Sequence, residues 1–265
     1  MKRLCVLLAA TLFAFGCVED AKNASEPASK TSGRIRGLVR LNGTLPPPSF
    51  ESPKEHDDIC GHQVPLQRIA LGKGNGVQET FVYLDGVQDV RTFPKPSSVL
   101  VDQRHCEYTP HVMIVPAGTK LEITNSDPIL HNVHGLQMAD DGMQTIFNVA
   151  QPVRGQRTIV EPALTRPGIV YLACEAGHAW MNAYVFVAGH PYITLTDQAG
   201  EFVIPNVPAG KYRIRMWHEG VTMKRNLETL QRYEYEEPYE MTQDVEVRAG
   251  SDSVINFEFS LRPST

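Results

Sequence analysis

The sequence predicts an all-β protein built from two β-sandwiches, and three observations support this fold class. Short runs rich in β-branched and aromatic residues recur along the chain. Glycine, proline, asparagine or aspartate bounds each run, and no stretch shows a sustained period of 3.6 residues. Runs of this kind, joined by turns, are typical of antiparallel sandwiches of the Greek-key type.

The first sandwich is expected over residues 34–189. Residues 34–41 carry alternating apolar side chains with a glycine interruption, and they end at the turn Asn42-Gly43. Residues 44–58 are rich in proline and charge, and we expect them to form a loop. Further strands are expected at residues 79–84, 111–115, 120–124, 145–149, 157–160, 168–174 and 182–187.

The second, smaller sandwich is expected over residues 190–265. The segment T-D-Q-A-G-E-F-V-I-P-N-V-P-A-G-K-Y-R-I-R alternates turns and strands. It resembles the immunoglobulin-like sandwiches of the carboxypeptidase-regulatory-like and transthyretin-like type, a motif that indicates a fold and says almost nothing about function. Residues 222–242 are expected to form a long loop or edge excursion before closing strands at 244–247 and 253–261.

The first residues indicate export. The chain starts M-K-R and continues with an apolar run that predicts a signal peptide over residues 1–16, too short to be a comfortable membrane span. The run ends in A-F-G-C, which resembles a bacterial lipoprotein cleavage box with Cys17 as the lipidated residue; cleavage there without lipidation is the alternative. Polar residues 17–33 are expected to be a flexible tether. We therefore expect a bacterial envelope protein, in the periplasm or at the outer membrane, held to the membrane by lipid.

Three cysteines remain for the folded part: Cys60, Cys106 and Cys174. In an oxidising compartment two of the three are expected to pair, and the third needs a reason to stay free. Cys60 and Cys106 are the provisional disulfide, because Cys174 has another role below. The alternative is a second metal site, in which this pair would join the nearby His62, His105 or His111.

The segment C-E-A-G-H-A-W-M, from Cys174 to Met181, places a thiolate, an imidazole and a thioether on one short loop after a strand. Sulfur and imidazole ligands suit copper, and two histidines with a cysteine and a weak axial methionine form an electron-transfer site. The second imidazole is expected from His131, in N-S-D-P-I-L-H-N-V-H. His134 is the alternative, although on an extended segment these two side chains point to opposite faces.

Each of these residues has an ordinary structural explanation when it is taken alone. Lone cysteines are commonly buried thiols, and a methionine or a loop histidine is commonly a packing residue. Their joint occurrence within eight residues at a strand end favours copper. The other histidines, including His190 and His218, are expected to be structural.

The motif L-H-N-V, followed by a strand-ending cysteine and then by histidine and methionine, resembles the cupredoxin family of blue copper proteins over residues 34–188. The resemblance implies a Greek-key sandwich in which one copper ion has two imidazole ligands, one thiolate and one weak axial ligand. It implies that Asn132 ties the two ligand loops together and that Trp180 flanks the site. The ligands that it implies are His131, Cys174, His178 and Met181.

The spacing C-x3-H-x2-M differs from the plastocyanin loop and is similar to the latter half of the dinuclear copper loop of cytochrome oxidase subunit II. That dinuclear centre requires a further cysteine at the position of Val170. The sequence therefore predicts a mononuclear site.

These observations predict a carrier of single electrons rather than an enzyme, with a redox partner protein such as a cytochrome or a copper enzyme. The chain has no H-E-x-x-H motif, nucleophile elbow or phosphate loop. Its net charge of −5 argues against nucleic acid as a partner. The alternatives are a non-catalytic binding or assembly module with a structural or vestigial copper site, and a copper delivery protein; the eight scattered methionines disfavour delivery.

Overall fold

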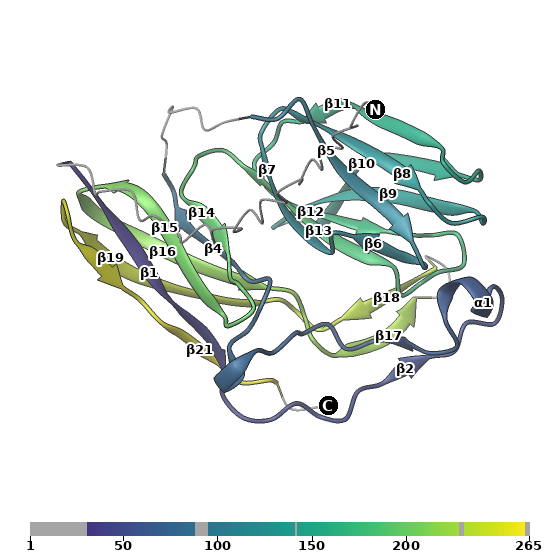
Figure 1. The fold of residues 1–265 in the computed structure, drawn as a ribbon, viewed down its shortest axis with the longest axis horizontal. Coiled ribbons are helices and arrows are strands. Elements are labelled where there is room, and N and C mark those ends of the chain that lie inside the picture. Colours follow the sequence, from purple (N-terminus) through teal and green to yellow (C-terminus); the bar gives the residue numbers. More distant parts are fainter. Residues whose placement is uncertain (1–30, 88–94, 141, 228–230, 263–265) are drawn as a thin grey trace, which may run out of the picture.

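The structure is a computed structural model that describes residues 31–87, 95–140, 142–227 and 231–262. The expected signal peptide, Cys17 and the expected tether up to residue 30 lie outside these ranges. The regular elements of the described residues are nearly all strands, arranged as two sandwiches side by side (Figure 1), so the predicted all-β class is confirmed. None of the helices within the described ranges is both long and apolar enough to span a membrane.

The first sandwich consists of a five-stranded and a four-stranded sheet. The five-stranded sheet has the order β10 (Gly142–Gln151), β9 (His131–Ala139), β12 (Gly168–Ala173), β13 (Asn182–Ala188) and β7 (Val112–Pro116). The four-stranded sheet has the order β11 (Arg157–Leu164), β8 (Thr119–Asn125), β5 (Ser98–Arg104) and β6 (Glu107–Thr109). β7 runs parallel to β13 and β5 runs parallel to β8, whereas the other neighbours are antiparallel.

The second sandwich draws strands from both halves of the chain. One sheet contains β15 (Glu201–Pro208), β1 (Ser32–Leu41) and β20 (Asp252–Val254), with β21 (Phe257–Phe259) also paired to β1. The other has the order β14 (Ile193–Leu195), β4 (Phe81–Asp85), β16 (Gly210–His218) and β19 (Tyr239–Val247).

The sheets therefore do not divide at residues 189 and 190, where the sequence placed the boundary between the sandwiches. β1 and β4 precede the first sandwich in the chain, yet they pair with strands of the second. The physical reason is that alternation along a strand shows which of its faces is buried but does not identify the neighbour that accepts its hydrogen bonds.

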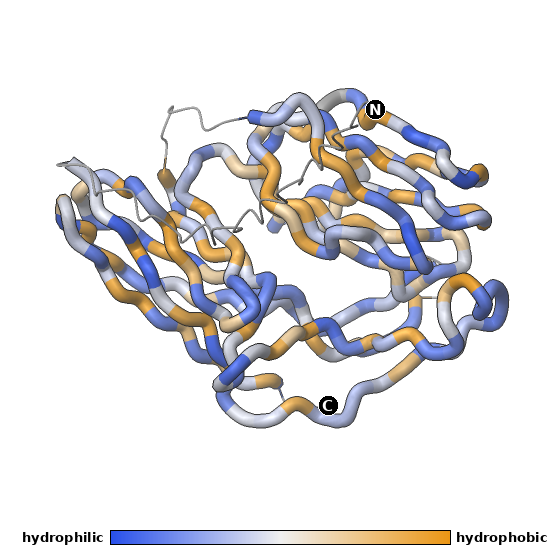
Figure 2. Tube along the Cα trace, viewed as in Figure 1, coloured by the Kyte–Doolittle hydropathy of each residue, from blue (hydrophilic) through white to orange (hydrophobic). Residues whose placement is uncertain are grey.

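The two sandwiches share an apolar interface. β12 and β13 are buried almost along their whole length, because one face of their sheet covers the first core and the other faces the second sandwich. At this interface the ring of Trp217 lies 5.0 Å from that of Tyr184, and the ring of Phe81 lies 5.4 Å from that of Phe186. Figure 2 shows apolar residues gathered along the strands of both sandwiches.

Smaller elements reach toward one end of the first sandwich. The expected excursion at residues 222–242 contains a hairpin of β17 (Met223–Leu227) and β18 (Arg232–Tyr235). Tyr233 of this hairpin donates its backbone N–H to the carbonyl of Ala179 at 3.1 Å. The remaining short elements are β2 (Phe50–Glu51), α1 (Asp57–Cys60), β3 (Val64–Pro65) and η1 (Lys73–Asn75).

Candidate metal centre

Three of the four expected ligands meet at one end of the first sandwich. His131 starts β9, and Cys174 follows the last residue of β12. Because these neighbouring strands are antiparallel, the two residues lie at the same end of the sheet. His178 lies in the loop after Cys174. The ligand atoms of His131, Cys174 and His178 all lie within 4.8 Å of one another, and all three residues are buried. We call them the donor set.

The loop from Cys174 to Met181 is closed by its own backbone. The N–H of Cys174 donates to the carbonyl of Met181 at 3.2 Å, and the N–H of Met181 donates to the carbonyl of His178 at 2.9 Å. Gly177 permits the tight turn with a φ of 85°, which other residues rarely adopt. Sγ of Cys174 lies 3.8 Å from Nδ1 of His178. Met181 is 1% exposed and packs in the same core cluster as Cys174.

Asp127 orients His131. Nε2 of His131 donates to an oxygen of Asp127 at 2.9 Å, and that carboxylate accepts the backbone N–H groups of His105 and Cys106, both at 2.9 Å. Burial alone would raise the pKa of Asp127, but the bonds from His131, Cys106 and His105 bring it below its usual value. Nδ1 of His131 is buried without a partner. A carboxylate on one imidazole nitrogen, with the other nitrogen free, is the usual arrangement around a metal-binding histidine.

The protonation states of the other two donors suit a metal. Burial, together with the charges of His131 and His56, lowers the pKa of His178 to about 4, so the ring is neutral near pH 7 and can bind a metal. Burial raises the pKa of the Cys174 thiol, although hydrogen bonds from backbone groups of Ala176, Asn132 and His178 oppose this. Cys174 therefore stays a thiol until a cation displaces its proton.

Asn132 and Trp180, the two residues expected beside the ligands, both make hydrogen bonds at this end of the sandwich. Oδ1 of Asn132 accepts the N–H of Glu175 at 3.1 Å, which joins the start of β9 to the ligand loop. The indole N–H of Trp180 donates to the carbonyl of Cys106 at 3.1 Å, and its ring meets that of His178 edge-on at 5.5 Å. Tyr108 is a further neighbour, and burial raises its pKa well above the usual value.

Cys60 and Cys106 form a disulfide, and Cys174 is the free cysteine of the described residues. Both disulfide sulfurs lie within 4.8 Å of a nitrogen of His178. His62 instead contacts Asp57 at 2.8 Å on the surface. Within the described ranges, the His/Cys/Asp/Glu groupings close enough to hold a metal contain none of the alternatives His62, His105 and His111.

His134 points away from the donor set. Nδ1 of His134 contacts Glu175 at 2.8 Å and Nε2 contacts the hydroxyl of Thr145 at 2.8 Å, so both nitrogens have partners. Nδ1 of His190 accepts the N–H of Tyr192 at 3.2 Å, and Nδ1 of His218 donates to the carbonyl of Glu219 at 2.8 Å. Asp127 was missed by sequence reasoning, although a carboxylate four residues before His131 was a usable signal.

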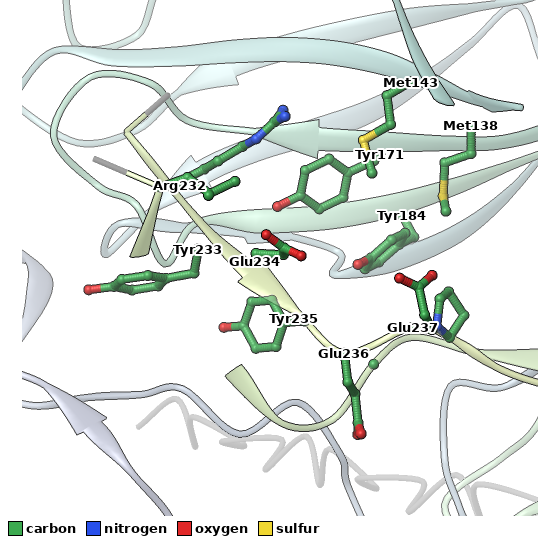
Figure 3. A pocket seen from close by; sticks show the side chains of 13 residues that line it. Met138, Met143, Tyr171, Tyr184, Arg232, Tyr233, Glu234, Tyr235, Glu236 and Glu237 are labelled. Carbon is green, nitrogen blue, oxygen red and sulfur yellow. The ribbon is translucent and has the colours of Figure 1, made fainter. Parts of the chain in front are cut away.

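A separate cavity of about 430 Å³ lies between the first sandwich and β18. Tyr171, Tyr184, Glu234 and Tyr235 surround it (Figure 3), and burial raises the pKa of both Tyr171 and Tyr184. The described residues that line it include no histidine or cysteine. This cavity is therefore distinct from the donor set.

Known proteins are similar to parts of this chain. A family model described as polysaccharide lyase family 4, domain II, matches residues 165–255. No curated protein matches. A copper-containing nitrite reductase from Thermus scotoductus is 19% identical, with a TM-score of 0.30, over 39% of this chain and 25% of its own; this chain thus spans a quarter of that protein.

Two smaller solved structures are also similar. A purple cupredoxin from Nitrosopumilus maritimus is 21% identical, with a TM-score of 0.29, over 34% of this chain and 98% of its own. An auracyanin from Roseiflexus castenholzii is 15% identical, with a TM-score of 0.30, over 36% of this chain and 99% of its own. The resemblance of residues 190–265 to the transthyretin-like type stays a prediction.

Proposed function

We propose that this chain binds one copper ion through His131, Cys174 and His178, with Met181 as a weak axial ligand, and that it carries single electrons. The observation that carries this proposal is the buried, unpartnered Nδ1 of His131, which lies within reach of a free cysteine and a neutral imidazole. Leaving a polar atom buried and unpaired costs about 1–3 kcal/mol, and a metal ion bound at Nδ1 would remove this cost.

The residues fit copper better than a hard cation. One sulfur and two imidazoles form a soft and borderline ligand set that suits copper, whereas magnesium and calcium prefer oxygen. A bound copper ion would supply one-electron chemistry by changing between the Cu(I) and Cu(II) oxidation states. Asp127, Asn132 and the closed loop hold the donors in place, so the chain needs little rearrangement when an electron arrives.

One ion is favoured over two. The position that would supply a bridging thiolate is Val170, which is fully buried in the apolar core. The two other described cysteines, Cys60 and Cys106, are joined to each other. The donor set therefore offers one thiolate.

The proposed setting is the bacterial envelope, with a signal peptide at residues 1–16 and a lipid on Cys17. The Cys60–Cys106 disulfide supports an oxidising compartment. A redox partner would meet the end of the first sandwich that carries the ligand loop. His178 is 5% exposed there, whereas the adjacent Gly177 is exposed, so electrons would pass through a thin layer of protein.

Loading with Cu(II) tests the proposal. We expect an intense visible thiolate-to-copper band and reversible one-electron reduction of the wild type. Cys174→Ser removes the thiolate and should abolish the band. The matched control is His134→Gln, which should keep the band because His134 contacts Glu175 and Thr145 instead. A colourless wild-type adduct, or a band that survives Cys174→Ser, would contradict the proposal, and copper binding without reversible reduction would favour a structural or delivery role.

A further inference from the structure

The backbone on both sides of Met181 is held by side chains from outside the ligand loop. Arg68 donates a hydrogen bond from Nη2 to the carbonyl of Trp180, the residue before Met181. His111 donates from Nδ1 to the carbonyl of Asn182, the residue after it, at 3.0 Å. Two positively charged side-chain types therefore hold the carbonyls that flank the proposed axial ligand.

Glu219, directly after β16 of the second sandwich, contacts His111 and acts on Arg68 through its charge. Nε2 of His111 donates to Oε1 of Glu219, whose side chain is 5% exposed. Burial alone would lower the pKa of His111, but Glu219 raises it, which favours the ring with both N–H groups present. Burial likewise opposes the charge of Arg68, but Tyr235 and Glu219 raise its pKa. A buried carboxylate of the second sandwich thus contacts His111, directly before β7, and its charge also favours the charged form of the half-buried Arg68.

Packing leaves Met181 incompletely supported. A cavity of about 50 Å³ is bordered by Met181 together with Arg68, Tyr108, His111 and Asn182. A void beside a side chain removes the dispersion contacts that would hold it there. The hydrogen bonds to the carbonyls of Trp180 and Asn182 therefore help to hold the Met181 segment on the side of this cavity.

We propose that Arg68, His111 and Glu219 form an anchor through which the second sandwich positions Met181 at the metal centre. This inference rests on the proposed function. The three are positioning residues, because they touch the carbonyls around Met181 or one another and none belongs to the donor set. The potential of such a copper site depends on its axial ligand, so a residue of the second sandwich would tune the centre from outside the first.

Glu219→Gln tests the anchor with a side chain of nearly the same shape. Removing one charge of a buried pair leaves the other uncompensated, so His111 should loosen its hold on Asn182. We expect the midpoint potential and the electron paramagnetic resonance spectrum of the copper-loaded variant to shift in the same direction as those of Met181→Leu, by a smaller amount. In a Met181→Leu background, Glu219→Gln should add no further shift, because both changes act through one side chain.

A second readout needs no metal. In the copper-free protein, peroxide oxidation of Met181, followed by peptide mass spectrometry, should be faster in Glu219→Gln than in wild type. The matched control is Arg215→Gln, which removes an ion-pairing residue of β16 whose partners are Asp85 and Glu240. This control should leave the potential and the oxidation rate at wild-type values. His111→Gln, which cannot reach both partners, provides an independent variant if Glu219→Gln fails to fold.

The results separate this inference from the proposed function. A wild type without the thiolate band or the reversible couple would contradict the proposed function. The oxidation rates of Met181 in the copper-free protein would still test the anchor. Wild-type potential, spectrum and Met181 oxidation rate in a folded Glu219→Gln or His111→Gln variant would overturn the anchor. A shift that persists undiminished in the Met181→Leu background would also overturn it, because the effect would then reach the centre by another route.

Discussion

The cores of the two sandwiches differ in how they treat polar side chains. In the second sandwich, residues such as Ile35, Leu84 and Phe257 are fully buried between the sheets, and the buried His218 lies against the same cluster, with its ring 6.1 Å from that of Phe259. In the first, an apolar cluster ends at a buried group of polar side chains that includes Asp127 and His131. The buried histidines differ in their partners: His218 donates to the carbonyl of Glu219, whereas Nδ1 of His131 has no partner among the described residues. The contrast supports the proposed binding role of the polar end of the first sandwich.

The largest effect is expected from a substitution in the apolar core of the second sandwich. Phe257→Ala should lower the free energy of unfolding by about 3–5 kcal/mol, because it empties a fully buried site. Urea unfolding followed by circular dichroism measures the loss. The matched control is Val254→Ala in β20, which pairs with β1 as β21 does. Val254 is 53% exposed, and the expected change is within about 0.5 kcal/mol. A changed copper spectrum in the folded Phe257→Ala protein would show that the two cores are not separable in this way.

A smaller effect is expected at the polar end of the first sandwich. Asp127→Asn keeps the shape of the side chain but removes the carboxylate that accepts from His131, so copper affinity should fall about 10–100-fold. Competition with a chelator of known affinity measures this. Asp102→Asn is the control, because Asp102 accepts from Ser126 and is close in chain and sheet to the same region. Equal affinities of the Asp127 and Asp102 variants would contradict the role given to Asp127.

The smallest effect is expected from His218, at the junction of the two sandwiches, on the pH dependence of stability. Burial lowers the pKa of His218, so below about pH 6.5 the unfolded chain binds a proton that the folded chain does not. Stability from this residue is therefore lost as pH falls, by at most about 1.4 kcal/mol per pH unit. His218→Asn should flatten the change in unfolding free energy between pH 7 and pH 5, whereas the exposed His62→Asn should not. Identical slopes for wild type and His218→Asn would contradict this expectation.

The sequence was a good guide to local structure and to donors that share a short segment. Cys174, His178 and Met181 could be grouped because they lie within one loop, and His131 could be added because its residue type completed a known ligand set. β-branched and aromatic residues marked most strands, including β8, β12 and β13, because these side chains fit a pleated, half-buried surface.

Contacts between distant segments could not be predicted in the same way. Nothing in the alternation of β1 shows that it pairs with β15, because the hydrogen-bonding backbone is the same in every strand. His111 and Glu219 are 108 residues apart, and each looks like an ordinary surface residue until the sandwiches pack together. Asp127 is an intermediate case, since its spacing from His131 was visible but its bonds to the backbone of Cys106 were not.

The position of β1 has a consequence for orientation. The strand β1 (Ser32–Leu41) starts at the left of Figure 1, far from α1, and Cys60 of α1 lies close to His178 of the donor set. A membrane tether that joins the fold at Ser32 would therefore pull on the far end of the molecule from His131. Such a protein would stand with its copper end pointing into the aqueous space, where a partner that diffuses along the membrane or through the periplasm could reach it.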